Sequence, residues 1–202
     1  GRAAGPVRGG VVLTAGSLFS GGLALDMAVE SVLGARTVWT CDVDPHVRRL
    51  LAHRAPWAPN LGDVAKVDWS RVPRVDVIAG GFPCTDVSGA GRQAGLRPGT
   101  RSGLWSHMAY AIGQMRPRLV FIENVRGLTY ASAHSDVEPC SGCVGDDPTE
   151  SAVRALGAVL GDLADLGFDA EWGCLSAKAF GANHERNRIW ILASNSDMPQ
   201  CK

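Results

Sequence analysis

The sequence predicts an α/β protein with a mostly parallel sheet covered by helices on both faces, a Rossmann-like arrangement. Short apolar runs rich in β-branched residues alternate with longer stretches at helical spacing. The apolar runs are nearly continuous, which is typical of strands buried on both faces. Because such sheets bind ligands beyond the carboxyl ends of their strands, functional residues are expected there.

The elements follow one another along the chain. Strands are expected near 11–18, 37–41, 75–79, 119–122, 168–173 and 189–193, and helices near 23–32, 45–53, 102–115 and 151–166. The last helix follows Asp146, Asp147 and Pro148, which suit a helix start, and Gly167 suits its end. Asp63 stands where a further strand would end.

We expect a loose leader over 1–10, one domain over 11–194 and a tail over 195–202. Two irregular stretches interrupt the domain: the Gly-rich segment 80–100 and a polar, acidic insert over 129–149. Irregular loops of this length are usually functional.

Composition excludes several classes of protein. A hydrophobic fraction of 46% excludes wholesale disorder. No apolar run approaches the roughly 18 residues of a membrane span, and the start lacks the apolar core of a signal peptide. We therefore expect a cytoplasmic protein without a membrane partner. The 20 basic and 20 acidic residues argue against a globally basic nucleic-acid binder but leave room for a local basic face.

The six cysteines are expected to be reduced thiols, since nothing indicates export. Cys41 lies on an expected strand, and both Cys41 and Cys174 are predicted to be core residues. Cys140 and Cys143 could form half of a zinc site, but structural zinc needs four ligands, so a surface insert with two free thiols is favoured.

A cofactor site is predicted at the ends of the first strands. The first strand ends in Gly21-Gly22, a turn that lets backbone approach a ligand. Asp42 and Asp44 end the second strand, where an acidic residue can accept hydrogen bonds from ribose hydroxyls. With Asp63 these residues favour a nucleoside-type cofactor. The alternative is that Asp44 caps a helix and Asp63 closes a turn.

A nucleophile and an acid are predicted at the next two strand ends. Cys84 follows a buried strand within a Gly/Pro-rich loop, where a thiol can be activated as a thiolate. Glu123 ends the following strand and would lie beside that loop. Such a pair is suited to covalent catalysis.

These residues strongly resemble the cytosine-5 DNA methyltransferase family. Gly80-Gly81-Phe82-Pro83-Cys84 and Glu123-Asn124-Val125 carry the resemblance, which covers nearly all of 18–193. The weaker motifs, in family order, are Phe19-Ser20-Gly21, Asp42 with Asp44, Gly62-Asp63-Val64, Arg101-Ser102-Gly103-Leu104-Trp105, and Gly181-Ala182-Asn183-His184-Glu185-Arg186-Asn187-Arg188.

The resemblance implies S-adenosylmethionine as cofactor and duplex DNA, with a flipped cytosine, as substrate. Cys84 would attack carbon 6 of the ring, and Glu123 would contact ring nitrogen 3 and the exocyclic amine. Carbon 5 would take the methyl group, and loss of its proton would expel the thiol. Arg186 and Arg188 would steady the flipped base and nearby phosphates.

The resemblance also implies the binding contacts. Phe19 would pack on the adenine, Asp42 or Asp44 would hold the ribose, Asp63 would reach the adenine amine, and Trp105 would lie near the methionine part. The full predicted cofactor set is Phe19, Ser20, Gly21, Gly22, Asp42, Asp44, Asp63, Val64, Gly81, Pro83 and Trp105. The predicted substrate contacts are Phe82, Ser88, Asn124 and Val125, and no metal is expected.

Two departures from the family pattern keep alternatives open. Leu23 and Ala24 stand where the family has glycines, and side chains there could clash with the cofactor or require a backbone that glycine tolerates best. The family's target-recognition part would follow Lys202. An RNA cytosine-5 methyltransferase is a separate alternative, because the catalytic chemistry does not choose the polymer. The two departures leave open a truncated or partner-dependent non-catalytic remnant. A separate target-recognition chain or a restriction endonuclease system would then be its partner.

Overall fold

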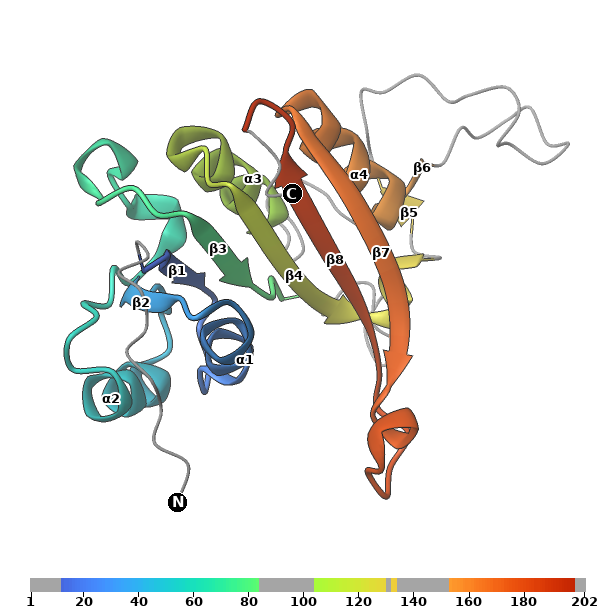
Figure 1. Cartoon of the computed structure of the whole chain (residues 1–202), viewed down its shortest axis with the longest axis horizontal. Coiled ribbons are helices and arrows are strands. Elements are labelled where there is room, and N and C mark those ends of the chain that lie inside the picture. The colour runs from blue at the N-terminus through green and yellow to red at the C-terminus, as the bar shows by residue number, and fades with distance from the viewer. Residues whose placement is uncertain (1–11, 84–103, 130–131, 134–152, 199–202) are drawn as a thin grey trace, which may run out of the picture.

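The computed structural model describes residues 12–83, 104–129, 132–133 and 153–198. A six-stranded sheet forms the centre, in the order β2-β1-β3-β4-β8-β7 (Figure 1). The strands are β1 (Thr14–Leu18), β2 (Arg36–Trp39), β3 (Val77–Gly80), β4 (Leu119–Val125), β7 (Phe168–Ser176) and β8 (Asn187–Asn195). β1 to β4 are parallel, and β8 runs antiparallel to both β4 and β7.

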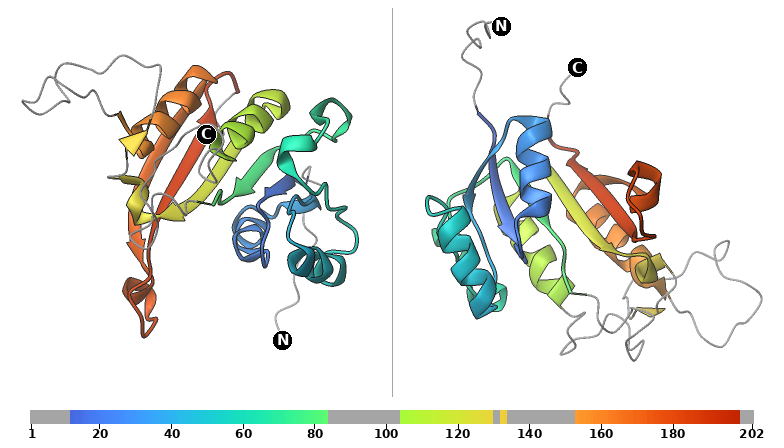
Figure 2. Two further views of the ribbon diagram at one scale, coloured as in Figure 1. Left: turned by 180° about the vertical axis from the view of Figure 1, so that it is seen from behind. Right: turned by 90° about the horizontal axis from the view of Figure 1, so that it is seen from below.

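Helices cover both faces of this sheet (Figures 1 and 2). α1 (Ala24–Leu33) lies on one face with α2 (Pro45–Arg54) beside it, and α3 (Leu104–Met115) and α4 (Ala155–Asp165) lie on the other. The shorter elements are the 3-10 helices η1 (Val64–Lys66), η2 (Trp69–Arg71), η4 (Arg126–Thr129) and η5 (Ala177–Phe180) and the two-stranded sheet β5 (Ser132–Ala133) with β6 (Val153–Arg154).

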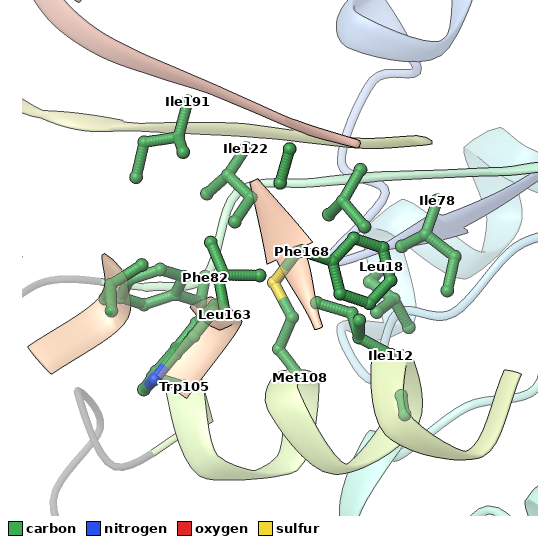
Figure 3. Close-up of a cluster of buried hydrophobic side chains, with 14 of the residues drawn as sticks. Leu18, Ile78, Phe82, Trp105, Met108, Ile112, Ile122, Leu163, Phe168 and Ile191 are labelled. Carbon is green, nitrogen blue, oxygen red and sulfur yellow. The ribbon is translucent and has the colours of Figure 1, made fainter. Parts of the chain in front are cut away.

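The larger core lies between the sheet and the α3–α4 layer (Figure 3). Ile78, Ile122 and Ile191 project from three strands towards Met108 of α3 and Leu163 of α4, and all five are essentially inaccessible to solvent. Each such side chain stabilises the fold by roughly 1.5–3 kcal/mol. This packing fixes the strand ends at which the predicted site residues lie.

The predicted α/β class is confirmed, but the strand expected to end near Asp63 is not formed. The segment makes only an isolated parallel bridge between Thr40 and Asn60. Pro56 and Pro59 have no N–H to donate to a ladder, which explains why no longer pairing develops.

Two smaller expectations also fail. The helix predicted from residue 151 begins at Ala155, because Val153 and Arg154 pair with β5 instead. Cys174 is exposed rather than buried, because it lies in the second half of β7, where the side chains are partly or fully exposed.

The strand order places a topological switch beside β1. β1 pairs with β2 on one side and with β3 on the other. The chain therefore builds the sheet outward from β1 first towards β2 and then, on the opposite side, towards β3 and β4. Ligands of such sheets bind in the crevice beyond the strand ends at this point. In the described ranges, no helix is long and apolar enough to cross a bilayer.

Candidate active site

The turn after β1 is tied to the end of β2. The Cys41 amide donates to Ser20 Oγ (3.0 Å), and the Ser20 amide donates to the Cys41 carbonyl (3.3 Å). The Gly21 amide donates to Asp42 Oδ2 (2.9 Å). Gly21 adopts a left-handed φ of 48°, a conformation that glycine takes at little cost. The predicted residues Ser20, Gly21 and Asp42 therefore lie together at one sheet edge.

Asn60 holds the next loop against Asp42. Its Oδ1 accepts from the amides of Asp42 (3.0 Å) and Gly62 (2.9 Å), and its Nδ2 donates to the Asp42 carbonyl (3.1 Å). Sequence reasoning missed this positioning residue. Its signal was an asparagine two residues before a glycine, since such side chains hydrogen-bond backbone two residues further on.

Asp44 and Asp63 act as caps in the described structure. Asp44 Oδ1 accepts from the amides of His46 (2.7 Å) and Val47 (3.1 Å) at the start of α2, and these hydrogen bonds lower the pKa of Asp44. Asp63 caps η1, accepting from the Ala65 amide (3.1 Å). Asp44 thus caps a helix, as the alternative expected, and Asp63, which was expected to close a turn, caps the single turn of η1. The contact of either residue with a cofactor stays a prediction.

Cys41 is a core thiol, as predicted. It is buried, and its Sγ donates to the Gly62 carbonyl (3.2 Å). Burial, followed by the charges of Asp42 and Asp63, raises the pKa of Cys41 to about 12. Because the thiolate is the nucleophile, this cysteine is inert at neutral pH.

Two glycines let the end of β3 approach its neighbours. A Cβ on Gly80 would lie 2.7 Å from the Leu18 carbonyl oxygen. A Cβ on Gly81 would lie 2.9 Å from the Glu123 carbonyl oxygen and 3.1 Å from Glu123 Oε2. Only a residue without a side chain therefore fits between β3 and the Glu123 carboxylate.

The side chains of Phe82 and Trp105 point into the core (Figure 3). Their rings pack with centroids 5.3 Å apart, and both are almost fully buried. Trp105 Nε1 donates to Asp162 Oδ2 of α4 (2.6 Å). The sequence predicted a substrate contact for Phe82 and a cofactor contact for Trp105. In the structure both side chains anchor the chain after β3 and the start of α3, and their contacts with substrate and cofactor stay predictions.

Glu123 and Arg188 form an ion pair. Arg188 lies opposite Val125 in the β4–β8 register, on the sheet face that also bears Glu123. Arg188 Nε is 2.6 Å from Glu123 Oε1, and the two side chains are 23% and 28% exposed. Two predicted catalytic residues, 65 positions apart in the sequence, thus meet at the carboxyl end of β4.

Asn124 faces the opposite side of β4 and is buried. Its Nδ2 donates to the Phe82 carbonyl (3.1 Å), and its Oδ1 accepts from the Val125 amide (2.8 Å). The side chain thereby links the end of β4 to the segment leading towards Cys84. Val125 itself is partly exposed, beside Arg188.

An open cavity of about 690 Å³ adjoins the ion pair. Its lining residues are Arg126, His184, Glu185, Arg186, Asn187 and Arg188. Arg126 was not predicted, and its signal was a basic residue directly after Glu-Asn-Val. The cavity is therefore rich in guanidinium groups, which suit phosphate contacts.

Several predicted residues lie outside the described residues, namely Cys84, Ser88, Cys140 and Cys143. Pro83 is the last described residue before Cys84, and Gly81 touches Glu123. The chain therefore enters the Cys84 segment beside the Glu123 carboxylate. In the part of the chain that the structure describes, no group of three or more His, Cys, Asp or Glu residues could hold a metal.

Comparison with known proteins identifies the family. The model of the C-5 cytosine-specific DNA methylases matches residues 13–201. The chain belongs to this family. It is 32% identical over 190 residues to the type II methyltransferase M.Eco47II of Escherichia coli, and 28% identical over 187 residues to M.NlaIV of Neisseria lactamica.

The matched region is a part of these relatives. The alignments cover 93% and 90% of this chain but 40% and 41% of M.Eco47II and M.NlaIV, so the chain spans about two fifths of their length. The Entamoeba histolytica methyltransferase EhMeth (TM-score 0.67, 13% identity) and S. pombe Dnmt2 (TM-score 0.62, 16% identity) share the fold. Those matches cover 93% and 94% of this chain, and 54% and 51% of the solved chains. The predicted Rossmann-like methyltransferase sheet is confirmed.

Proposed function

We propose that this chain transfers a methyl group from S-adenosylmethionine to carbon 5 of cytosine in duplex DNA. The observation that carries the proposal is the Glu123–Arg188 ion pair, set against Gly81 at the start of the segment leading to Cys84. Membership of the C-5 cytosine-specific DNA methylases supports the same chemistry.

The residues at the β1–β2 edge fit the cofactor. Leu23 replaces a family glycine, but its side chain packs with Leu51 of α2 and with Ala55, the residue after α2, so it does not fill the turn. Asp42 Oδ2 accepts from the Gly21 amide and Oδ1 from the Asp44 amide (3.0 Å). Since each carboxylate oxygen has a further lone pair, Asp42 can still accept from ribose hydroxyls.

Phe19, Asp42 and Asp63 would hold S-adenosylmethionine, with the adenine on Phe19. When bound, the cofactor supplies an electrophilic methyl group. Phe19 is partly exposed beside the core and adopts a left-handed φ of 53° at the strand end. A strained residue of this kind at a strand end is typical of ligand sites.

The chain's own residues would activate the base. The Cys84 thiolate would add to carbon 6, and the displaced ring electrons would make carbon 5 nucleophilic. Glu123 would contact ring nitrogen 3 and the exocyclic amine, and Arg188 would keep its carboxylate in place. Release of the carbon 5 proton from the methylated ring would return the carbon–sulfur bonding electrons to Cys84.

Trapping with 5-fluorocytosine tests the proposal, because fluorine cannot leave carbon 5 as a cation. Wild type with S-adenosylmethionine and duplex DNA containing 5-fluorocytosine should form a covalent complex that survives denaturation. Cys84→Ser should form none. Cys174→Ser, which alters an exposed thiol of β7, should trap normally. Absence of the complex from wild type that binds S-adenosylhomocysteine would contradict the proposal for this chain alone.

A second candidate is a catalytic part that depends on another polypeptide for its substrate. The coverage of about two fifths of the relatives favours it. The same trap distinguishes the candidates. Cofactor binding without a DNA or RNA adduct supports partner dependence, whereas an adduct formed only on 5-fluorocytosine RNA supports the RNA methyltransferase alternative.

A further inference from the structure

A second cavity lies away from the β4–β8 site, between α1 and α2. Its volume is about 470 Å³, and it extends from Asp26 and Glu30 of α1, past Thr37 of β2, to Trp57 after α2. This volume lies within the range of roughly 300–1,000 Å³ typical of small-molecule sites. The proposed methyl transfer makes no use of these residues.

Polar atoms at this cavity are left without partners. Asp26 is 4% exposed and Thr37 is 3% exposed. Asp26 Oδ1 and Thr37 Oγ1 are buried and have no hydrogen-bond partner among the described residues, and both residues are among those that line the cavity. In the described part of the chain, the Ser17 hydroxyl is the one side-chain hydrogen-bonding group that acts on the Asp26 carboxyl, and because an under-satisfied buried carboxyl is costly, a donor entering the cavity would be favoured.

The charged neighbours leave Asp26 available to such a donor. Arg54 is the basic residue among those lining the cavity, and its Nη1 donates to the Gly22 carbonyl (2.9 Å). Glu30 Oε1 accepts from the Thr37 amide (2.8 Å), which adds a second negative charge. The excess of acidic groups and acceptors therefore favours a cationic occupant over an anionic one.

The remaining walls are apolar. Leu23, Met27 and Ala55 line the cavity with the Trp57 ring, whose Nε1 is fixed by donation to the Thr37 carbonyl (3.2 Å). An aromatic face attracts organic cations, and aliphatic walls accommodate a hydrocarbon chain. No cluster of three potential metal ligands occurs in the described ranges, which disfavours a metal ion here.

We propose that the cavity between α1 and α2 binds a protonated primary alkylamine. Its ammonium group donates to the Asp26 carboxyl, and its carbon chain lies along Leu23, Ala55 and Trp57. The proposal is independent of the methyltransferase chemistry, since it needs neither Cys84 nor the Glu123–Arg188 pair.

Butylammonium and its neutral counterpart butan-1-ol provide the test, by NMR titration of the purified chain. Butylammonium should bind at least about tenfold more tightly, because a charge-assisted hydrogen bond contributes about 1.5 kcal/mol or more. The amides of Asp26 and Thr37 and the Trp57 indole should shift. Asp26→Asn should remove the preference, and Trp57→Ala should weaken both probes.

Glu171→Gln, which removes an exposed carboxylate from β7, is the matched control and should leave the affinities for butylammonium and butan-1-ol unchanged. Equal binding of the two probes by wild type would overturn the proposal, as would shifts confined to residues elsewhere. The proposal would also be overturned if a folded Asp26→Asn variant still preferred butylammonium to butan-1-ol. The comparison of probes on wild type decides the matter even if a variant fails to fold.

Discussion

At the scale of single residues, Gly81 allows the chain that follows β3 to approach Glu123 closely. A methyl group at this position would meet both the backbone and the carboxylate of Glu123. We predict that Gly81→Ala slows adduct formation by about 100-fold or more, because a displacement of about 1 Å costs that much. Single-turnover trapping with 5-fluorocytosine DNA measures the rate.

Gly173→Ala on β7 is the matched control, since among the described residues nothing lies within 4 Å of a Cβ added there. It should trap at the wild-type rate. A Gly81→Ala variant with the wild-type rate would show that the position of the Glu123 carboxylate does not limit the chemistry.

Arg188 is expected to matter for activity more than for stability. The ion pair with Glu123 is partly exposed, so its loss should change the free energy of unfolding by less than about 1 kcal/mol. We predict that Arg188→Ala slows adduct formation by about 10–1,000-fold, because the variant no longer orients the Glu123 carboxylate, which is proposed to stabilise developing charge. Urea denaturation and the trapping rate measure the two effects.

The Lys178–Glu185 pair on the same hairpin provides the comparison, with side chains 68% and 70% exposed. Lys178→Ala should leave both quantities unchanged. Equal losses of stability and activity in Arg188→Ala would instead indicate a purely structural pair.

Asp26 should make stability depend on pH. Burial raises the pKa of Asp26 from 3.8 to about 6. The negative charge of Glu30 adds to this shift, whereas the nearby Ser17 hydroxyl opposes it. The other polar residues that line the same cavity are Thr37 and Arg54. The folded state thus holds this proton more tightly than the unfolded state. The resulting stability is complete below about pH 4 and is lost as pH rises through 6, a change of about 3 kcal/mol.

We therefore predict that Asp26→Asn, which is neutral throughout, gains stability relative to wild type between pH 4.5 and 7.5. Urea denaturation of both proteins at the two pH values measures the gain. Groups common to both proteins cancel in the difference. A difference independent of pH would show that Asp26 ionises normally in the fold.

The sequence predicted the chemistry of individual residues better than their contacts. Residue type and order along the chain were sufficient to place Glu123 at a strand end. They did not reveal the burial of the Phe82 ring, because the direction of a side chain just beyond a strand depends on tertiary packing, here against Trp105. Asn60 was missed because its hydrogen bonds join loops whose proximity only the fold creates.

At the scale of elements, Leu23 in the turn before α1 has a strained backbone and a buried side chain, which act on stability in opposite directions. Leu23 is the N-cap of α1 with a left-handed φ of 65°, where the family has glycine. That conformation costs a leucine roughly 1–2 kcal/mol. The side chain is buried against Leu51, Ala55 and Ala58, and such packing is typically worth 2–5 kcal/mol.

We predict that Leu23→Gly lowers the free energy of unfolding by about 1–3 kcal/mol, because lost packing outweighs relieved strain. Affinity for S-adenosylhomocysteine should not improve, since the leucine packs on α2. Denaturation and calorimetry measure these quantities. Ala24→Gly at the exposed first helical position should cost less than about 1 kcal/mol. Tighter binding by Leu23→Gly would mean that Leu23 does obstruct the cofactor.

Element order was predictable because buried strands and amphipathic helices have different hydrophobic periods. The strand expected before Asp63 is not formed, which shows that a hydrophobic pattern alone does not predict strand pairing. An apolar composition around Leu61 indicates burial, but the prolines at 56 and 59 remove the donors that pairing requires. Likewise, Cys174 is exposed because the second half of β7 is left largely uncovered by tertiary packing, which no local pattern encodes.

At the scale of the whole molecule, the net charge of zero limits how strongly this chain can hold DNA. Beside the proposed site, Arg126 and Arg186 are exposed and line the open cavity, whereas Arg188 is paired with Glu123. About two phosphates should therefore be neutralised. Counterion release makes the logarithm of the association constant fall linearly with the logarithm of salt concentration, with a slope of about −0.9 for each phosphate contact. For two contacts we therefore expect a slope near −2.

We predict that Arg186→Ala reduces the size of this slope by about 1 and weakens all duplex sequences alike, as removal of one phosphate contact should. Fluorescence anisotropy with a labelled duplex at several salt concentrations measures it. Arg48→Ala, which removes an exposed arginine from α2, should leave the slope unchanged. A slope of −6 or steeper, or one insensitive to Arg186→Ala, would mean that DNA lies on a surface other than the cavity beside Glu123.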